Sequence, residues 1–407
     1  MIIIKGGVTA PRGFLASGVK AGIKKSGKLD LALLYSELPA VAAAAFTTNR
    51  FQASPVKVSK LHLKNKTHQA IIVNSGNANC ANGTVGDKDA VKMTEFIAQA
   101  LLLHKKEVLA ASTGIIGKYL PIERIEAAIP KLVGDLSEAK AGKFAEAIMT
   151  TDTVKKELAV KVKLGTATVA IGGTCKGVGM IYPLMKTEGR HATMLCFLTT
   201  DAAITKGALS ASLDEVIDDS FNMISVDGDM STNDSCFIMA NGLAENKKIA
   251  SKGSDYYKFT EALKFVASEL AKKLARDGEG ATKFIEIYVT GAKDEEDAKV
   301  IARKISTSNL FKCCIYGEDP NWGRVVAAAG ASGVRFNAEK IDVYLGPIKA
   351  LANGTSVKGF DKEKARAIFK EKNIHIKVDL KSGRANATAW TCDFSKEYVV
   401  INSEYST

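Results

Sequence analysis

Hydrophobic positions in this chain follow two periods, one typical of helices and one typical of strands. The stretch KFTEALKFVASELAKKLARDGEG places apolar side chains three or four positions apart, at Phe259, Leu263, Val266, Leu270 and Leu274. This spacing puts them on one face of a helix, and Gly278 follows them as expected of a helix end. The stretch DAVKMTEFIAQALLL, which starts at Asp89, has the same period and predicts another helix.

Strands are predicted where apolar and polar residues alternate. ELAVKVKLGTATVAIGG alternates on both sides of Gly165 and Thr166, which predicts an antiparallel hairpin. NIHIKVDLKSGRANATAWTCDFSKEYVVIN has the same character and predicts a second hairpin that turns at Ser382 and Gly383. Because helices and antiparallel hairpins mix along the chain, we predict an α/β fold of layered sheets flanked by helices, not a doubly wound parallel sheet.

A domain boundary is expected near Lys283. The stretch IEIYVTGAKDEEDAKVIARKI, which follows RDGEGATKF, predicts a new strand, loop and helix. We therefore expect a larger α/β domain at residues 1–282 and a smaller α/β domain at residues 283–407. With 407 residues, of which 46% are hydrophobic and 25% charged, the chain is long enough for two such domains with cores of ordinary size.

The composition excludes several classes of protein. No run approaches the roughly 18 consecutive apolar residues of a membrane helix, and the N-terminal apolar residues precede the first charges, unlike a secretory signal. We therefore expect a cytoplasmic protein without a membrane partner. The seven cysteines form no CxxC pair and the five histidines no metal-ligand spacing, so we expect reduced thiols and no metal.

Positive charge is concentrated in the first half of the chain. The net charge is +12, and residues 1–192 hold 27 Lys and Arg against 14 Asp and Glu. A basic surface can bind nucleic acid or attract carboxylate substrates. The lysines are spread out, and no RNP, KH or helix-turn-helix signature accompanies them. We therefore favour a solvated basic surface and expect no nucleic-acid partner.

Four polar loops of small residues each follow an apolar stretch that predicts a strand. They are NSGNANC, STG, SVDGDMSTNDS and YGEDPNWGR. Any one of them could be an ordinary turn, but four such loops at strand ends predict a site. In STG, Gly114 allows close backbone approach, so its neighbouring N–H groups and the Thr113 hydroxyl could bind an oxyanion.

Thr193 stands where a glycine-rich loop meets the apolar run MLCFLTT. One interpretation is that it begins a buried strand, which suits threonine. The other is that it is a nucleophile. A threonine needs a base beside it, and its own α-amine, with a pKa of about 7.7–8.0, serves only at a chain N-terminus. That role would require cleavage of the Ala192–Thr193 bond.

Ten motifs in order along nearly the whole chain resemble the ornithine acetyltransferase (glutamate N-acetyltransferase) family of arginine biosynthesis. They are TAPRGFLASGVKAGIK, NSGNANC, STGIIG, MTTDT, KGVGMIYP, ATML, SVDGDMSTNDS, DGEGATKF, DPNWGR and INSEYST. The resemblance implies a fold like that of the self-processing N-terminal-nucleophile amidases and aminopeptidases, with a smaller C-terminal α/β domain. It also implies self-cleavage into an α chain, residues 1–192, and a β chain from residue 193, assembled as two αβ units.

The resemblance also implies an activity: acetyl transfer from N-acetylornithine to glutamate, by a ping-pong mechanism through an acetyl-threonine. No cofactor is implied, and acetyl-CoA stays open as another donor. Thr193 would be the nucleophile, with Thr113 and Gly114 as the oxyanion hole. The implied substrate contacts are Thr150 (or its neighbour Thr151), Lys176, Thr193, Glu279, Asn402 and Thr407. Chemically, Lys176 suits a substrate carboxylate and Glu279 a substrate ammonium.

One departure from the family pattern lies before the cleavage site. The family writes Pro-x-Met-Ala-Thr-Met-Leu without a break, whereas KTEGRH separates Met185 from Ala192 here. The insertion bears on the rate of self-cleavage and on substrate preference. An amidase or aminopeptidase, in which water replaces glutamate as the acceptor, is the alternative function.

Overall fold

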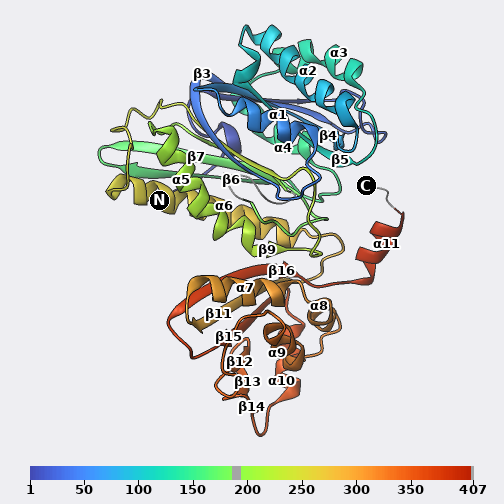
Figure 1. Ribbon diagram of the computed structural model, residues 1–407, viewed down its shortest axis with the longest axis vertical. Coiled ribbons are helices and arrows are strands. Elements are labelled where there is room, and N and C mark those ends of the chain that lie inside the picture. The colour runs from blue at the N-terminus through green and yellow to red at the C-terminus, as the bar shows by residue number, and fades with distance from the viewer. Residues whose placement is uncertain (186–193, 405–407) are drawn as a thin grey trace.

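The computed structural model describes residues 1–185 and 194–404. Two mixed sheets and their helices form a larger part, at the top of Figure 1, and a smaller part below it. The predicted class, layered α/β sheets flanked by helices, is confirmed. No helix in the described ranges has the length and apolar character needed to cross a membrane.

The larger sheet combines parallel and antiparallel pairs. Its order is β1 (Ile2–Ile4), β6 (Lys156–Leu164), β7 (Ala167–Lys176), β8 (Leu195–Thr200), β10 (Ser235–Ala240), β3 (Leu31–Phe46), β4 (His68–Asn77) and β5 (Val108–Ile115), with β2 (Phe14–Val19) on β3. The β8–β10 and β4–β5 pairs are parallel and the others antiparallel. The predicted hairpin is confirmed as β6–β7, because Leu164 pairs with Ala167 across the turn.

Helices cover this sheet. They are α1 (Ser54–His62), α2 (Gly83–Leu101), α3 (Ile122–Gly134), α4 (Ala141–Ile148), α5 (Lys206–Asp218) and α6 (Ser254–Arg276). The two helices predicted from periodicity are confirmed as α2 and α6. Short 3-10 turns lie at Gly7–Thr9, Lys105–Glu107, Glu138–Lys140 and Phe221–Met223.

Both faces of the β3–β4 region are buried. Leu31, Leu33 and Ile72 pack toward α2 and α3, whereas the intervening Leu34 and Val73 join the core that contains α4. The second set belongs to a core whose rings include the contacting Phe144, Phe197 and Phe237. Burial on both sides explains why residues 31–34 of β3 and 70–73 of β4 are continuous apolar runs instead of alternating ones.

The smaller sheet has the order β14 (Thr355–Ser356), β13 (Ile348–Ala352), β12 (Asp342–Leu345), β15 (Asn373–Asp379), β11 (Phe284–Ala292), β16 (Ala385–Cys392) and β9 (Ile224–Ser225). Its helices are α7 (Glu295–Ser306), α8 (Asn309–Tyr316), α9 (Trp322–Gly330), α10 (Lys362–Phe369) and α11 (Lys396–Glu404). The second predicted hairpin is wrong, because β11 lies between β15 and β16 and pairs with both. The boundary at residue 283 stays a prediction.

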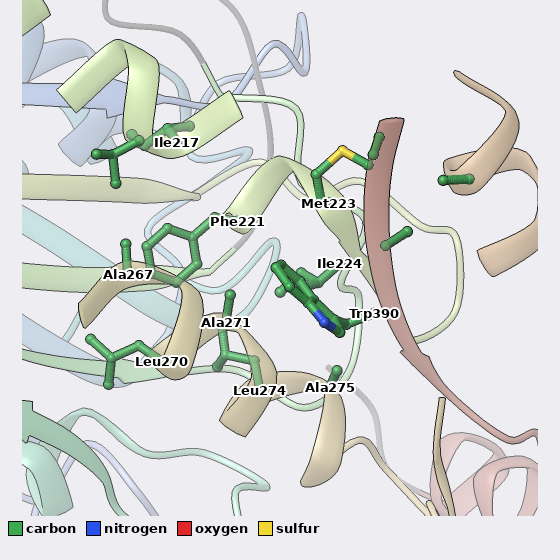
Figure 2. Close-up of a cluster of buried hydrophobic side chains, with 14 of the residues drawn as sticks. Ile217, Phe221, Met223, Ile224, Ala267, Leu270, Ala271, Leu274, Ala275 and Trp390 are labelled. Carbon is green, nitrogen blue, oxygen red and sulfur yellow. The ribbon is translucent and has the colours of Figure 1, made fainter. Parts of the chain in front are cut away.

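A continuous apolar core joins the two parts of the molecule. Trp390 on β16 lies beside Ile224 of β9 and near Leu274 and Ala275 of α6 (Figure 2). The β9 strand comes from the larger part of the chain but pairs with β16 of the smaller sheet. This packing holds the chain after α6, including Glu279, close to the ends of the larger sheet.

Candidate active site

A small pocket lies where strand ends and loops of the larger part converge. The cavity has a volume of about 140 Å³. Its walls come from the ends of β5 and β7, from the loops after α4, β7, β9 and α6, and from α11. The lining residues are Thr113, Gly114, Ile116, Thr150, Thr151, Lys176, Gly179, Met180, Asp227, Asp229, Ser231, Asn233, Glu279, Tyr398 and Asn402.

Gly114 allows the end of β5 to lie directly against β4. It pairs with Gly76, and its φ of +132° favours glycine. A Cβ added at Gly114 would lie 2.4 Å from the carbonyl carbon of Gly76 and 2.5 Å from the nitrogen of Asn77. The residue therefore has to be glycine for the STG turn to keep this position.

The variant Gly114→Ala is expected to be destabilised by roughly 1–3 kcal/mol, because the added methyl group overpacks two backbones. Gly117→Ala is the matched control. Gly117 also has a positive φ, +78°, but nothing lies within 4 Å of its added Cβ. Thermal unfolding measures the stability lost by each variant. Because both positions have a positive φ, the extra loss in Gly114→Ala reports the clash and not backbone strain. Equal losses of stability would contradict the close contact at Gly114.

Lys176 provides a buried ammonium in the wall of the pocket. Its Nζ donates to Thr150 Oγ1 at 2.8 Å and to Thr113 Oγ1 at 3.3 Å, and lies 3.9 Å from Asp152 Oδ2. Burial lowers the pKa of Lys176, and the Asp152 carboxylate opposes that effect only in part. The Lys176 ammonium thus has two threonine hydroxyls as hydrogen-bond partners, and the nearest carboxylate, that of Asp152, lies beyond hydrogen-bond distance.

A buried ion-pair network holds Lys176 in place. Asp152 accepts hydrogen bonds from Gly177 N at 2.8 Å and from Lys156 Nζ at 2.8 Å, and Lys156 also pairs with Asp277 at 2.5 Å. Burial alone would raise the pKa of Asp152, but Lys176, Lys156 and the Gly177 bond hold it at about 2. Asp152 therefore remains ionised between two lysines.

Glu279 provides a carboxylate in the wall of the same pocket. Its Oε1 accepts from Thr151 Oγ1 at 2.7 Å, and its Oε2 accepts from Asn402 Nδ2 at 2.9 Å. A Cβ at Gly179 would lie 2.2 Å from Glu279 Oε2, so only glycine at 179 leaves room for this carboxylate. Glu279 forms no ion pair with a described residue, so its charge faces the pocket without a cation.

A second acid lies beside the pocket. Asp227 accepts from the N–H groups of Met180 at 2.6 Å and Ile181 at 2.9 Å, and from the Tyr398 hydroxyl at 3.3 Å. Burial raises the pKa of Asp227 despite these backbone bonds, and burial with the Asp227 charge raises the pKa of Tyr398. Asp227 therefore ties the loop after β7 to α11.

The structure brings together six of the sequence-predicted residues: Thr113, Gly114, Thr150, Lys176, Glu279 and Asn402. Thr150 contacts Lys176 and Thr151 contacts Glu279, so both members of the MTTDT pair lie at the site. Ala192, Thr193 and Thr407 lie outside the described residues.

Three of the four polar loops meet at the site. Asn233 Nδ2 donates to the carbonyls of Ala78 at 2.6 Å and Ser112 at 2.8 Å, which joins the loops after β4 and β9 to the strand β5. The fourth loop, YGEDPNWGR, does not line the pocket. It follows the helix α8 instead of a strand, and Asn321 in it caps α9. The prediction that a strand precedes this loop is therefore wrong, and its contribution to the site stays a prediction.

Sequence reasoning missed two buried acids. Asp152 stands in the quoted motif MTTDT, but only the burial of two lysines beside it identifies its function. Asp234 is fully buried, and neither carboxylate oxygen has a hydrogen-bond partner among the described residues. Burial raises the pKa of Asp234 well above its ordinary value, and the Lys176 charge opposes the shift. No local pattern marks either residue.

The fold and the pocket define a layered α/β enzyme in which a buried lysine and a buried glutamate line one small cavity. The profile of the ArgJ family matches residues 15–407. The chain is 47% identical to the arginine biosynthesis bifunctional protein ArgJ of Dehalococcoides mccartyi, covering 100% of this chain and 98% of that protein. The chain therefore belongs to the ArgJ family.

Solved structures resemble parts of the chain. The ArgJ protein of Bacillus halodurans is 45% identical with a TM-score of 0.51, covering 52% of this chain and 100% of that chain. The ornithine acetyltransferase of Mycobacterium tuberculosis, solved with ornithine, is 40% identical with a TM-score of 0.42. The match covers 45% of this chain and 98% of that chain. An Ochrobactrum anthropi aminopeptidase, described as a variant of the Ntn hydrolase fold, is 11% identical with a TM-score of 0.40. The match covers 69% of this chain and 88% of that chain.

Proposed function

We propose that this protein transfers acetyl from N-acetyl-L-ornithine to L-glutamate through an acetyl-threonine at Thr193. The observation that carries the proposal is the pocket itself. It is lined by a buried lysine and a buried glutamate, beside Thr113 and Gly114. Membership of a family named for arginine biosynthesis supports the choice of substrates.

The charges suit the acetylated donor. N-acetylornithine carries an α-carboxylate, which Lys176 can bind, and a side-chain ammonium, which Glu279 can bind. Glutamate shares the α-carboxylate but has a carboxylate where ornithine has its ammonium. Glu279 therefore favours the donor and gives no charge attraction to the acceptor.

The proposed chemistry has two matched steps. Thr193 Oγ attacks the acetyl carbonyl carbon while its proton passes to its own α-amine, and the Gly114 N–H and Thr113 hydroxyl stabilise the oxyanion. The amide C–N bond then breaks, and ornithine leaves with that proton on its nitrogen. In the second step the glutamate amine attacks the acetyl-threonine carbonyl carbon, the ester C–O bond breaks, and the Thr193 hydroxyl regains its proton. Because Thr113 Oγ1 accepts from Lys176, its own hydrogen remains available to donate.

Self-cleavage between Ala192 and Thr193 is part of the proposal, because it creates the α-amine. The Bacillus halodurans chain supports it, since 52% of this chain accounts for the whole of that chain. A chain that begins at residue 193 would be just over half of the 407 residues. We propose that the product assembles as two αβ units.

Asp234 is suited to hold the new α-ammonium. The backbone N–H of Ser235, the first residue of β10, donates to the carbonyl of Met194 at 2.8 Å, so Asp234 directly precedes β10 and lies beside the segment that enters β8. A buried carboxyl without a hydrogen-bond partner is costly, and a cation beside it would remove that cost. The cation expected at this point of the chain is the ammonium of residue 193.

Steady-state kinetics test the activity. With N-acetylornithine and glutamate both varied, a ping-pong enzyme gives parallel lines in double-reciprocal plots. Intersecting lines, with no acetyl-enzyme detected by mass spectrometry, would exclude the covalent route. Release of acetate from N-acetylornithine at a rate unaffected by glutamate would favour the amidase alternative.

The variant Glu279→Gln should separate the two substrates. Loss of one charge-assisted bond, about 1.5–3 kcal/mol, is expected to raise the KM for N-acetylornithine roughly 10- to 100-fold. The KM for glutamate should stay the same or fall, because a like charge is removed. Initial rates with each substrate varied check this split.

Glu126→Gln is the control for a lost negative charge, because Glu126 is exposed on α3 and does not line the pocket. It should leave both KM values unchanged. An equal rise of both KM values in Glu279→Gln would contradict the assignment of Glu279 to the donor's ammonium.

A further inference from the structure

One side of the active-site pocket is closed by the helix α11. Tyr398 and Asn402 on this helix line the pocket, and α11 lies at the side of the molecule, apart from both sheets (Figure 1). Two described hydrogen bonds join it to the pocket. The Tyr398 hydroxyl donates to Asp227 Oδ2 at 3.3 Å, and Asn402 Nδ2 donates to Glu279 Oε2 at 2.9 Å. The helix is therefore a wall of the pocket that is attached through polar groups.

This wall has little apolar packing behind it. None of its residues Lys396–Glu404, all within the described ranges, is buried, and Val399 and Val400 are exposed. By contrast α10, of similar length, buries Ala365 and Phe369. A helix this short is only marginally stable by itself, and each hydrogen bond adds little. Breaking the two bonds therefore costs little, and α11 can open from the pocket and close again.

The base of α11, in contrast, is fixed to the body of the protein. Ser395 Oγ donates to the carbonyl of Gly280 at 2.6 Å, and the N–H of Phe394 donates to the carbonyl of Lys312 at 3.3 Å. Gly280 directly follows Glu279 in the chain. The helix therefore starts from the loop that carries a pocket carboxylate, and the residues after Ser395 can move about this point.

Closure of the pocket matters because the proposed acetyl-threonine is an ester, which water can also attack. In that side reaction the water oxygen attacks the acetyl carbonyl carbon, the ester C–O bond breaks, acetate leaves, and the Thr193 hydroxyl regains its proton. Water is smaller and far more abundant than glutamate, so an open pocket favours hydrolysis. Transfer to glutamate therefore requires a wall that keeps water away from the ester.

We infer that α11 is a lid that excludes water from the acetyl-enzyme, and that Tyr398 is the positioning residue that holds this lid closed against Asp227. Asp227 is a firm anchor, because the backbone N–H groups of Met180 and Ile181 also bind its carboxylate. Tyr398 thereby determines the acceptor, since water and the glutamate amine compete for the same ester. The inference rests on the proposed function, because it concerns the acetyl-threonine.

Acetate release in the absence of glutamate tests the lid. The variant Tyr398→Phe keeps the ring and removes the hydroxyl that binds Asp227. With N-acetylornithine alone, we expect it to release acetate about tenfold faster than the wild-type protein, because a hydrogen bond to a charged group is lost and the open state is populated more. With glutamate present, the ratio of acetate to N-acetylglutamate should rise by a similar factor. A merely structural defect would lower both products instead.

Val399→Ala is the matched control on the same helix, because Val399 is exposed and does not line the pocket. It should release acetate and form N-acetylglutamate at the wild-type rates. Acetate release by Tyr398→Phe at or below the wild-type rate would overturn the inference. An equal rise in Val399→Ala would overturn it too, because the effect would then not depend on the bond to Asp227.

Hydrogen exchange measures the opening of α11 without relying on activity. The measurement uses the Thr193→Ala background, in which no acetyl-threonine can form at residue 193. Adding Tyr398→Phe should make the amides of α11 exchange about tenfold faster and leave those of α6 unchanged. Equal exchange of α11 with and without the Tyr398 hydroxyl would overturn the inference.

The two proposals fail in different ways. A wild-type protein that forms no N-acetylglutamate would reject the proposed function, while hydrogen exchange would still show whether Tyr398 holds α11 in place. Normal transfer by the wild type, with acetate release and exchange that ignore the Tyr398 hydroxyl, would reject the lid alone.

Discussion

The variant Thr193→Ala is expected to remain a single chain of 43.3 kDa and to lose acetyl transfer completely. Both effects have one cause, because the same hydroxyl would attack the Ala192 carbonyl during cleavage and the acetyl group during catalysis. The wild-type protein should consist of two chains, residues 1–192 and 193–407. Intact-mass spectrometry and the acetyl-transfer assay measure the two effects.

Thr193→Ser is the control, because it keeps a hydroxyl and removes one methyl group. It should still be cleaved, at a lower rate, and should retain measurable transfer. A wild-type protein that is fully active as one uncleaved chain would disprove the N-terminal-nucleophile mechanism. Acetyl transfer by Thr193→Ala would disprove it equally.

The variant Asp152→Asn is expected to cost the most stability, about 3–5 kcal/mol, because it removes the carboxylate shared by two buried lysines. The side chains of Asp152 and Lys156 are fully buried, so Lys156 would keep only Asp277. Urea unfolding in the single-chain Thr193→Ala background measures this loss without interference from dissociation of the cleaved chains.

The contribution of the Asp152 carboxylate to the free energy of unfolding is expected to fall as the pH is lowered. The pKa of Asp152 is about 2 in the folded protein and about 3.9 in an unfolded chain. Its stabilisation is therefore complete above about pH 4 and is lost as the pH falls through about 2. The stability difference between the parent and Asp152→Asn should shrink over that window.

Asp135→Asn is the control for a partly exposed acid, because Asp135 pairs with Lys131 and Lys140 and its side chain is 31% exposed. It should cost far less than Asp152→Asn. Similar losses in the two variants would contradict the importance of burial in the Asp152 network.

Local pattern was enough to predict the elements whose partners are adjacent in sequence. The helices α2 and α6 follow from apolar spacing, and the β6–β7 hairpin follows from alternation around Gly165. Alternation failed at β15 and β16, because it reports that a strand has one buried face and not which strand lies beside it. There β11, from about 80 residues earlier in the chain, takes the place between them.

The sequence by itself determined which residues carry the candidate chemistry: Thr113, Gly114, Lys176, Glu279 and the family motifs around them. Only the tertiary structure decided that Lys176 and Glu279 line one cavity, and that the buried Asp152 lies beside Lys176. The physical reason is that charge is costly to bury and favourable to pair. Its effect therefore depends on distances between residues that sequence separation does not specify.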